Sequence, residues 1–358
     1  MSEKKFRKII VHVGQMKTGT TQIQNTLFNN SAKLAEFSIL YPAEGLQTKG
    51  HHSILRLLSG KADEFKSITE YGAPGDEAVI MRILQDAPAT DTLILSSEQL
   101  FLAVQQLSEK LREFDLYLNT LSSDVRYMAY VREPVSQYPS MASQILMRST
   151  LLPRFDWTYK LSSLVTFKNL FRERFSVRVY DRKMFKEGDV LNDFLINVVG
   201  LGTGAKGFEP AAEPNVSLSA EGMYLVQSMG LLNQLREPSN FPNHGEQMHK
   251  VASFIRWAGS KQVEYVSATL KEDVIDMIKT ATHPQLELLD DNFGIRFDVP
   301  PTKPVVGPKQ HALFHQLVKN VFQVDADRTA KLIDNLLSRQ RLPDDFRYLL
   351  ASIPLPVN

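Results

Sequence analysis

The feature that most constrains the fold is an apolar run that ends in a glycine-containing loop and continues as a helical pattern. Residues 9–13 read Ile-Ile-Val-His-Val, residues 14–21 read Gly-Gln-Met-Lys-Thr-Gly-Thr-Thr, and the helical pattern occupies about 20–30. A strand that turns directly into a helix directs backbone N–H groups and the positive end of the helix dipole toward one point. The sequence therefore predicts an anion-binding loop at the end of a strand.

The following 170 or so residues repeat the alternation of short apolar runs with helical patterns. Strands are predicted at 8–13, 91–96, 125–131 and 176–180, and helices at about 20–30, 105–120, 135–148, 158–174 and 188–199. This order is typical of an α/β fold, a parallel sheet flanked by helices. Ligands of such sheets bind at the carboxyl ends of the strands. Four candidate site residues lie at the ends of predicted strands: Gly14, Glu98 and Arg132 come after a strand, and Tyr180 is the last residue of one.

The second half of the chain has a helical pattern. Helices are predicted at about 219–236, 245–258, 267–281, 309–322, 326–340 and 343–351. Ser219 is the expected N-cap of the first of them. Residues 298–308 are rich in proline and predict a stiff linker.

The glycine loop differs from the loop that binds nucleoside triphosphates. That loop has the pattern Gly-x-x-x-x-Gly-Lys-Ser/Thr, in which the lysine follows the second glycine. Here Thr20 follows Gly19, and the lysine is Lys17, so the spacing from Gly14 to Gly19 is kept while the cation has moved. We therefore expect a P-loop-NTPase-like architecture whose loop holds a different phosphorylated donor.

Two separate segments resemble the sulfotransferases that use 3′-phosphoadenosine 5′-phosphosulfate (PAPS). The run Lys17-Thr18-Gly19-Thr20-Thr21 is similar to the core by which that family holds the 5′-phosphosulfate. Arg132 and Ser140 have the spacing of the Arg and Ser by which the family binds the 3′-phosphate. A phosphate dianion without a metal needs a guanidinium fork and hydroxyl donors. Pro139 departs from the pattern, because a proline there removes a backbone donor and would kink or delay the helix.

Further segments extend the resemblance over roughly residues 8 to 300. They follow in the order found in bacterial-type, carbohydrate-sulfotransferase-like members: Ser96-Ser97-Glu98, Val177 to Asp181, Gly188 to Leu195, and Asn215 to Ser219. The resemblance implies a sulfotransferase domain at 1–300, with an acceptor-loop insert at about 40–90. Residues 301–358 are expected to form a helical C-terminal extension.

The resemblance implies roles for the residues of the loop and of the rim. Lys17 would stabilise the charge that develops on the leaving 5′-phosphate oxygen. The hydroxyl and amide groups of Thr18, Thr20 and Thr21 would hold the 5′-phosphate, and Tyr180 would lie near the adenine unless it is a core tyrosine. PAPS is the expected co-substrate, without a metal. The expected acceptor carries a hydroxyl or amine group, and a saccharide is the class that the resemblance favours.

The general base is predicted to be Glu98. A carboxylate at the carboxyl end of a strand, beside the donor, can accept the proton of an acceptor hydroxyl. Glu98 can instead cap the helix that follows it. His51 and His52, in a turn next to Gly50, are the competing bases and candidate acceptor-site residues.

The composition and the N-terminal residues limit the remaining function classes. The chain of 358 residues has no cysteine, which excludes disulfides and thiol catalysis, and its net charge of +1 provides no overall field for nucleic acid. The N-terminal apolar run of about five residues is too short for a signal peptide or a membrane span, so we expect a cytoplasmic protein. Its oligomeric state is open.

The alternatives to a sulfotransferase are a P-loop kinase or NTPase that requires magnesium, and a non-catalytic nucleotide-binding interaction protein.

Overall fold

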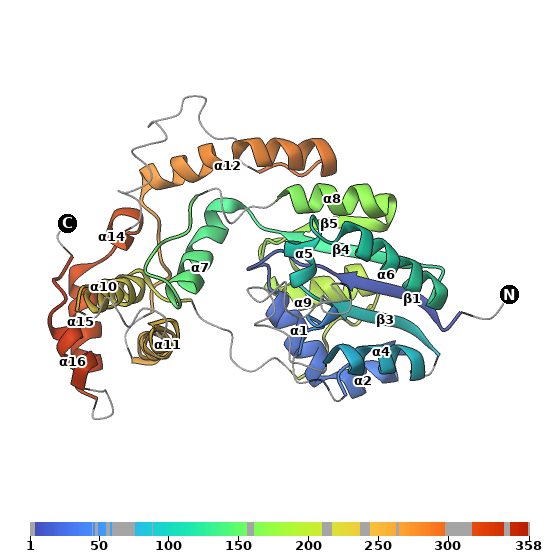
Figure 1. Ribbon diagram of the computed structural model, residues 1–358, viewed down its shortest axis with the longest axis horizontal. Coiled ribbons are helices and arrows are strands. Elements are labelled where there is room, and N and C mark those ends of the chain that lie inside the picture. Colours follow the sequence, from blue (N-terminus) through green and yellow to red (C-terminus); the bar gives the residue numbers. More distant parts are fainter. Residues whose placement is uncertain are drawn as a thin grey trace. The chain divides into compact units, whose positions relative to one another are not determined.

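Within the described residues, five parallel strands form the sheet that the alternation predicts. They are β1 (Phe6–His12), β2 (Ile39–Leu40), β3 (Thr90–Ser96), β4 (Val125–Val131) and β5 (Phe175–Val179), in the order β2-β3-β1-β4-β5. Figure 1 labels β1, β3, β4 and β5. The computed structural model describes residues 4–44, 46, 49–54, 58, 76–87, 89–155, 161–209, 217–236, 244–262, 265–297, 317–339 and 344–356. The predicted α/β fold class is thereby confirmed.

The middle of each central strand is apolar. Val11 of β1 pairs with Leu95 of β3 on one side and with Tyr127 of β4 on the other, and all three side chains are fully buried. Parallel strands covered by helices on both faces have such continuous apolar runs, which is why they were recognisable in the sequence. Because β3 and β4 flank β1, the loops that follow these three strands leave the sheet at the same edge.

The chain forms two compact units. Unit 1 consists of residues 1–133, 160–214 and 287–296, and unit 2 consists of residues 134–159, 215–286 and 297–358. This grouping differs from the predicted division at residue 300, because the last helices share their core with helices that precede that residue.

Unit 1 contains the sheet and the helices that pack on it. These are α1 (Thr20–Asn29), α2 (Ser31–Glu36), α4 (Asp76–Asp86), α5 (Gln99–Ala103), α6 (Ser108–Leu121), α8 (Leu161–Phe171) and α9 (Val190–Asp193). A 3₁₀ turn (Arg172–Arg174) follows α8, and a π-helical stretch (Phe194–Val199) follows α9. Ile23 and Leu27 of α1 share one core with Ile10, Tyr130 and Phe194.

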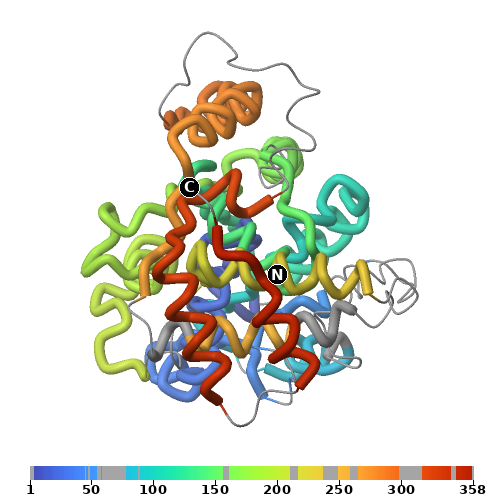
Figure 2. Tube along the Cα trace, turned by 90° about the vertical axis from the view of Figure 1, so that its left-hand side faces the viewer, coloured from blue at the N-terminus to red at the C-terminus, as the bar shows by residue number. Residues whose placement is uncertain are grey.

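Unit 2 is helical. Its helices are α7 (Pro134–Leu146), α10 (Ala220–Arg236), α11 (His244–Gln262), α14 (Val318–Val321), α15 (Ala326–Leu337) and α16 (Asp344–Ala351), together with most of α12 (Glu272–Phe293). The last helices, red in Figure 2, pack on α10. Ser219 is the N-cap of α10 as predicted, since the backbone N–H of Gly222 donates to its Oγ at 3.1 Å.

The observed helices differ from the prediction at two prolines. α7 begins at Pro134 and continues through Pro139, so the expected delay of this helix does not occur. α12 continues through Pro284 to Phe293, beyond the predicted end at 281. In both cases the packed environment of the helix outweighs the loss of one backbone hydrogen bond. The predicted linker at 298–308 lies outside the described residues. Of the predicted helix at about 309–322, the described part contains α14.

None of the helices in the described ranges is long and apolar enough to cross a membrane.

Candidate functional site

The loop between β1 and α1 has the backbone conformation of an anion-binding concavity. Lys17 has a φ angle of +65°, and Gly19 has a φ of +78° and a ψ of 9°. Such alternation of left-handed and ordinary residues turns successive N–H groups toward one side. Gly19 is also the N-cap of α1 and offers no side-chain acceptor to the N–H groups of the first turn. These N–H groups can therefore serve an anion at the helix terminus.

Both glycines of the loop are required by the space around them. A Cβ atom on Gly14 would lie 2.5 Å from Thr20 Oγ1 and 2.8 Å from His12 Nε2. A Cβ on Gly19 would lie 2.8 Å from Val190 Cγ1 and 2.9 Å from Tyr180 Cε2. The loop is thus packed closely against β1, α9 and the residue that follows β5.

The three threonines of the loop have different environments. Thr18 is fully buried, and its hydroxyl donates to the carbonyl of Gln15 at 2.5 Å. Its only hydroxyl proton is thus used inside the loop, and the role of Thr18 at a 5′-phosphate stays a prediction. Thr20 is buried, with no hydrogen-bond partner for Oγ1 among the described residues, and Thr21 is exposed.

Buried polar atoms without a hydrogen-bond partner in the described structure gather at the carboxyl ends of β1 and β3. Folded proteins pair almost all such atoms, since each unpaired one costs about 1–3 kcal/mol. The concentration of these atoms at one edge makes that edge the candidate site for a polar ligand. The atoms are His12 Nε2, Gln15 Nε2, Thr20 Oγ1, His52 Nδ1, Ser53 Oγ, Ser97 Oγ and Gln99 Oε1.

Arg132 contacts the glycine loop from the end of β4. Its Nη1 donates to the carbonyl of Lys17 at 3.3 Å, and its backbone N–H donates to Gln15 Oε1 at 3.3 Å. The guanidinium also lies 5.4 Å from the centre of the Tyr180 ring. Burial lowers the pKa of Arg132, which indicates a partly dehydrated cation that interacts more strongly with an anionic partner. The fold thus brings together two segments that are 115 positions apart.

Glu98 and Lys17 bring opposite charges close together at the same edge. Burial raises the pKa of Glu98, and the charge of Lys17 partly offsets this effect. Glu98 occupies the N-cap of α5, but its side chain makes no capping hydrogen bond, which contradicts the alternative role of a helix cap. A carboxylate with a raised pKa beside an anion-binding loop is suited to accept a proton.

His51 is a structural residue, contrary to its prediction as a competing base. Its Nδ1 accepts from the backbone N–H of Ser96 at 2.9 Å, so its Nε2 carries the proton that is donated to the carbonyl of Pro42 at 2.8 Å. The backbone N–H of His51 donates in turn to the carbonyl of Ser96 at 2.7 Å. Both ring nitrogens are used to join the turn at residues 50–54 to the end of β3.

His52 differs from its neighbour because no partner of its Nδ1 is found among the described residues. Burial lowers the pKa of His52 to about 4, so the imidazole is neutral at physiological pH. It can accept a proton, but it is a weaker base than an ordinary histidine. Its role as a base or acceptor-site residue stays a prediction. The core of the acceptor-loop insert, residues 59–75, lies outside the described residues.

Ser140 belongs to α7 of unit 2. Its Oγ lies 3.5 Å from Ser217 Oγ. In the next turn of α7, Ser143 Oγ accepts from the backbone N–H of Leu218 at 2.8 Å, so α7 contacts residues 217 and 218 at two points. The joint role of Ser140 and Arg132 at a 3′-phosphate stays a prediction.

Sequence reasoning missed a buried polar group beneath the loop. His12, Ser96 and Gln24 are almost completely buried and joined by hydrogen bonds. The available signal was the position of His12 and Ser96, which are polar residues at the ends of otherwise apolar strands.

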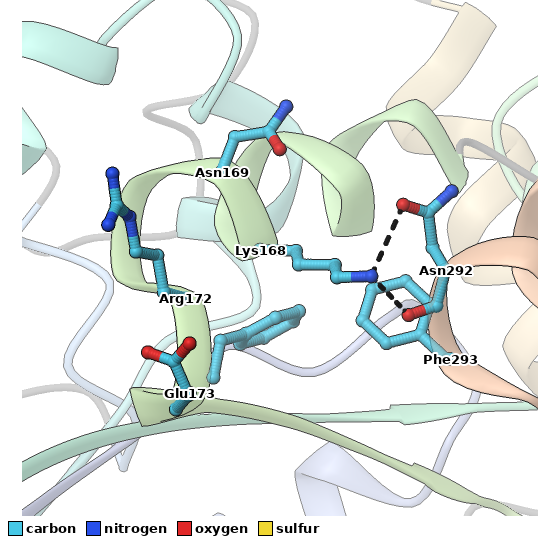
Figure 3. Close-up of a pocket in the computed structure, with 7 residues that line it drawn as sticks. Lys168, Asn169, Arg172, Glu173, Asn292 and Phe293 are labelled. Atoms are coloured by element: carbon cyan, nitrogen blue, oxygen red, sulfur yellow. Dashed lines mark hydrogen bonds between the residues drawn. The ribbon is translucent and has the colours of Figure 1, made fainter.

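A separate cavity of about 500 Å³ lies at the amino end of β5 (Figure 3). Lys168 Nζ donates there to the carbonyl of Asn292 at 2.5 Å and lies 5.3 Å from the centre of the Phe293 ring. Because β5 begins at Phe175, this cavity lies at the edge of the sheet opposite to the glycine loop. None of the predicted site residues lines it.

Comparisons of the chain with protein-family models, curated proteins and solved structures found no match. A search of the described residues for three or more His, Cys, Asp or Glu side chains that could hold a metal ion also found none.

Proposed function

We propose that the protein transfers the sulfuryl group of PAPS to a hydroxyl or amine group of an acceptor. The observation that carries this proposal is the left-handed turn of the glycine loop, with Lys17 in it and with Arg132 and Glu98 beside it. An anion-binding backbone, two cations and a carboxylate of raised pKa are together what a metal-independent group transfer requires.

The groups at this edge fit the phosphates of PAPS in number and kind. The N–H groups of residues 18–21 and the ammonium of Lys17 would hold the 5′-phosphate. Arg132 would pair with the 3′-phosphate, and the Tyr180 ring would stack near the adenine. Arg132 Nη1 donates to the Lys17 carbonyl at 3.3 Å, so this long hydrogen bond must break when the guanidinium pairs with a phosphate. The exchange of a hydrogen bond to a neutral carbonyl for one to a phosphate dianion is favourable.

The chain's own residues divide the remaining work between charge and proton transfer. PAPS supplies the activated sulfuryl group when it is bound. The oxygen or nitrogen of the acceptor attacks the sulfur atom, the bond between the sulfur and the 5′-phosphate oxygen breaks, and 3′-phosphoadenosine 5′-phosphate leaves. Lys17 stabilises the negative charge on that leaving oxygen, and Glu98 accepts the proton of the attacking group. Lys17 also affects Glu98, because its charge favours the ionised carboxylate that proton acceptance requires. A saccharide acceptor is proposed only from the resemblance to carbohydrate-type members.

A thermal-shift comparison tests the donor. We expect 3′-phosphoadenosine 5′-phosphate (PAP), the desulfated donor, to raise the melting temperature in the presence of EDTA, because a ligand that binds only the folded state stabilises it. ATP with magnesium should produce a smaller shift. A shift with ATP and magnesium alone would support a kinase or NTPase instead, and no shift with either ligand would support a non-catalytic interaction protein.

A further inference from the structure

The buried group His12, Ser96 and Gln24 lies directly beneath the glycine loop. Gln24 Nε2 lies 3.1 Å from Ser96 Oγ and 3.3 Å from the Ser96 carbonyl, and His12 Nδ1 lies 2.9 Å from Ser96 Oγ. His12 and Ser96 are fully buried, and Gln24 is 5% exposed. The rings of Tyr130 and Phe194 lie 6.0 and 5.5 Å from the His12 ring, so two sides of the imidazole are aromatic.

The hydrogen bonds of this group determine which nitrogen of His12 carries the proton. The Ser96 carbonyl only accepts, so the end of the Gln24 amide that faces it must be the NH₂ group. The same NH₂ group donates to Ser96 Oγ. His12 Nδ1 is the other atom within hydrogen-bond distance of this oxygen among the described residues, so the Ser96 hydroxyl proton finds an acceptor only there. His12 Nδ1 is therefore the acceptor and Nε2 carries the proton. Burial lowers the pKa of His12 to about 3, so the ring is neutral at physiological pH.

The Nε2–H group of His12 is directed toward the interior of the loop. His12 Nε2 and Thr20 Oγ1 lie 2.8 and 2.5 Å from a single point, the position that a Cβ of Gly14 would occupy. Both atoms are buried, and neither has a hydrogen-bond partner among the described residues. A hydrogen bond from Nε2–H to Thr20 Oγ1 would satisfy both atoms, and because Gly14 has no Cβ, the space that both atoms border stays open for it.

We propose that His12 is a positioning residue of the glycine loop, which donates from Nε2–H to the Thr20 hydroxyl oxygen and so leaves the Thr20 proton for the bound anion. Its partners Ser96 and Gln24 hold the imidazole in the tautomer that can donate. This inference rests on the proposed function, since the anion is taken to be the 5′-phosphate of the donor. His12 is fully buried and acts through Thr20, not by contact with the ligand.

A double-mutant cycle on PAP affinity tests the coupling between the two residues. His12→Phe keeps a flat ring but removes the donor, and Thr20→Val keeps the shape of threonine but removes the hydroxyl. We expect each single variant to weaken PAP binding about tenfold, since hydrogen bonds to charged groups contribute about 1.5–3 kcal/mol. We expect His12→Phe to have less than about a twofold effect in the Thr20→Val background, because the residue through which it acts is absent. His12→Gln, which retains an N–H donor, should bind nearly as tightly as the unchanged protein.

The outcomes separate this inference from the proposed function. If the unchanged protein does not bind PAP, both fail. If it binds PAP but the effects of His12→Phe and Thr20→Val simply multiply, His12 has only a structural role and the inference alone is overturned. Should His12→Phe not fold, ¹⁵N NMR of the unchanged protein decides: an Nε2-protonated neutral ring that shifts upon PAP addition is expected. An Nδ1-protonated or charged ring at pH 5–8 overturns the inference. His249→Gln, on an exposed position of α11, is the matched histidine control.

Discussion

Lys17 and Glu98 both occupy positions that destabilise the fold. Lys17 has a positive φ, a conformation that non-glycine residues adopt rarely and at a cost of about 1–3 kcal/mol. Burial raises the pKa of Glu98, so the ionised carboxylate lies in surroundings that favour its neutral form. Such unfavourable features persist mainly where they contribute to binding or catalysis. The two residues are therefore where we expect function and stability to conflict.

Glu98→Gln should show this conflict in opposite changes of stability and activity. Because the folded state binds the Glu98 proton more tightly than the unfolded state, the ionised carboxylate destabilises the fold at neutral pH, and this effect disappears below the unfolded pKa of about 4.3. We expect the variant to melt at a higher temperature than the unchanged protein at pH 7.5 and at the same temperature near pH 4. PAP affinity should be retained while turnover falls about a hundredfold or more.

The exposed Glu109→Gln on α6 is the control for that experiment and should change neither quantity. Normal turnover of Glu98→Gln would transfer the role of base to His52. A lower melting temperature at pH 7.5 would contradict the destabilising role of the carboxylate.

The elements that support the loop are tied together by one buried carboxylate. Asp193 of α9 accepts from Tyr130 of β4 at 2.6 Å and from Nε and Nη2 of Arg178 of β5 at 2.9 and 2.8 Å. Asn197 donates to it at 2.7 Å. Val190 of the same helix packs against Gly19, so this group of hydrogen bonds fixes the helix that borders the loop.

Asp193→Asn should destabilise the protein in a pH-dependent way. Burial alone would raise the pKa of Asp193, but the hydrogen bonds from Arg178, Tyr130 and Asn197 outweigh it, and the pKa is lowered. The stabilisation is therefore present above the unfolded pKa and is lost as the pH falls through the folded pKa. We expect a loss of about 1–3 kcal/mol at pH 7 in urea unfolding, and a difference that decreases as the pH falls below the unfolded pKa of about 3.9.

Asp91→Asn is the matched control, because Asp91 pairs with Arg7 at 3.7 Å on the exposed surface, where ion pairs contribute little. Equal losses for the two variants, or a loss for Asp193→Asn that does not depend on pH, would show that the buried carboxylate is not the stabilising group.

Across the whole chain, local sequence patterns predicted the helices and strands but not how these elements group into two units. The strands were predictable because a sheet covered on both faces requires continuous apolar runs. His51 forms hydrogen bonds with Ser96, and the buried group of His12, Ser96 and Gln24 joins α1 to the end of β3. Hydrogen bonds between residues so far apart in the sequence leave no local pattern from which they could be predicted. The division into two units could not be predicted for the same reason. Its boundary after Glu133 falls between β4 and α7, which follow each other in the sequence like the strand and helix of a single unit.

We propose that the glycine loop and Arg132 together hold a nucleotide that carries phosphates on both sides of its ribose. Lys17→Ala removes the cation of the loop, and Lys110→Ala, on an exposed position of α6, is its control. Hydrogen bonds to charged groups are strong enough that the loss of one phosphate or of Lys17 should weaken binding at least about tenfold.

The most direct test is calorimetric titration of the full chain with PAP in EDTA. We expect PAP to bind the unchanged protein and Lys110→Ala equally. AMP should bind the unchanged protein at least about tenfold more weakly than PAP, and Lys17→Ala should bind PAP at least about tenfold more weakly than the unchanged protein does. Absence of PAP binding, equal affinities for PAP and AMP, or unchanged PAP binding by Lys17→Ala would contradict this proposal.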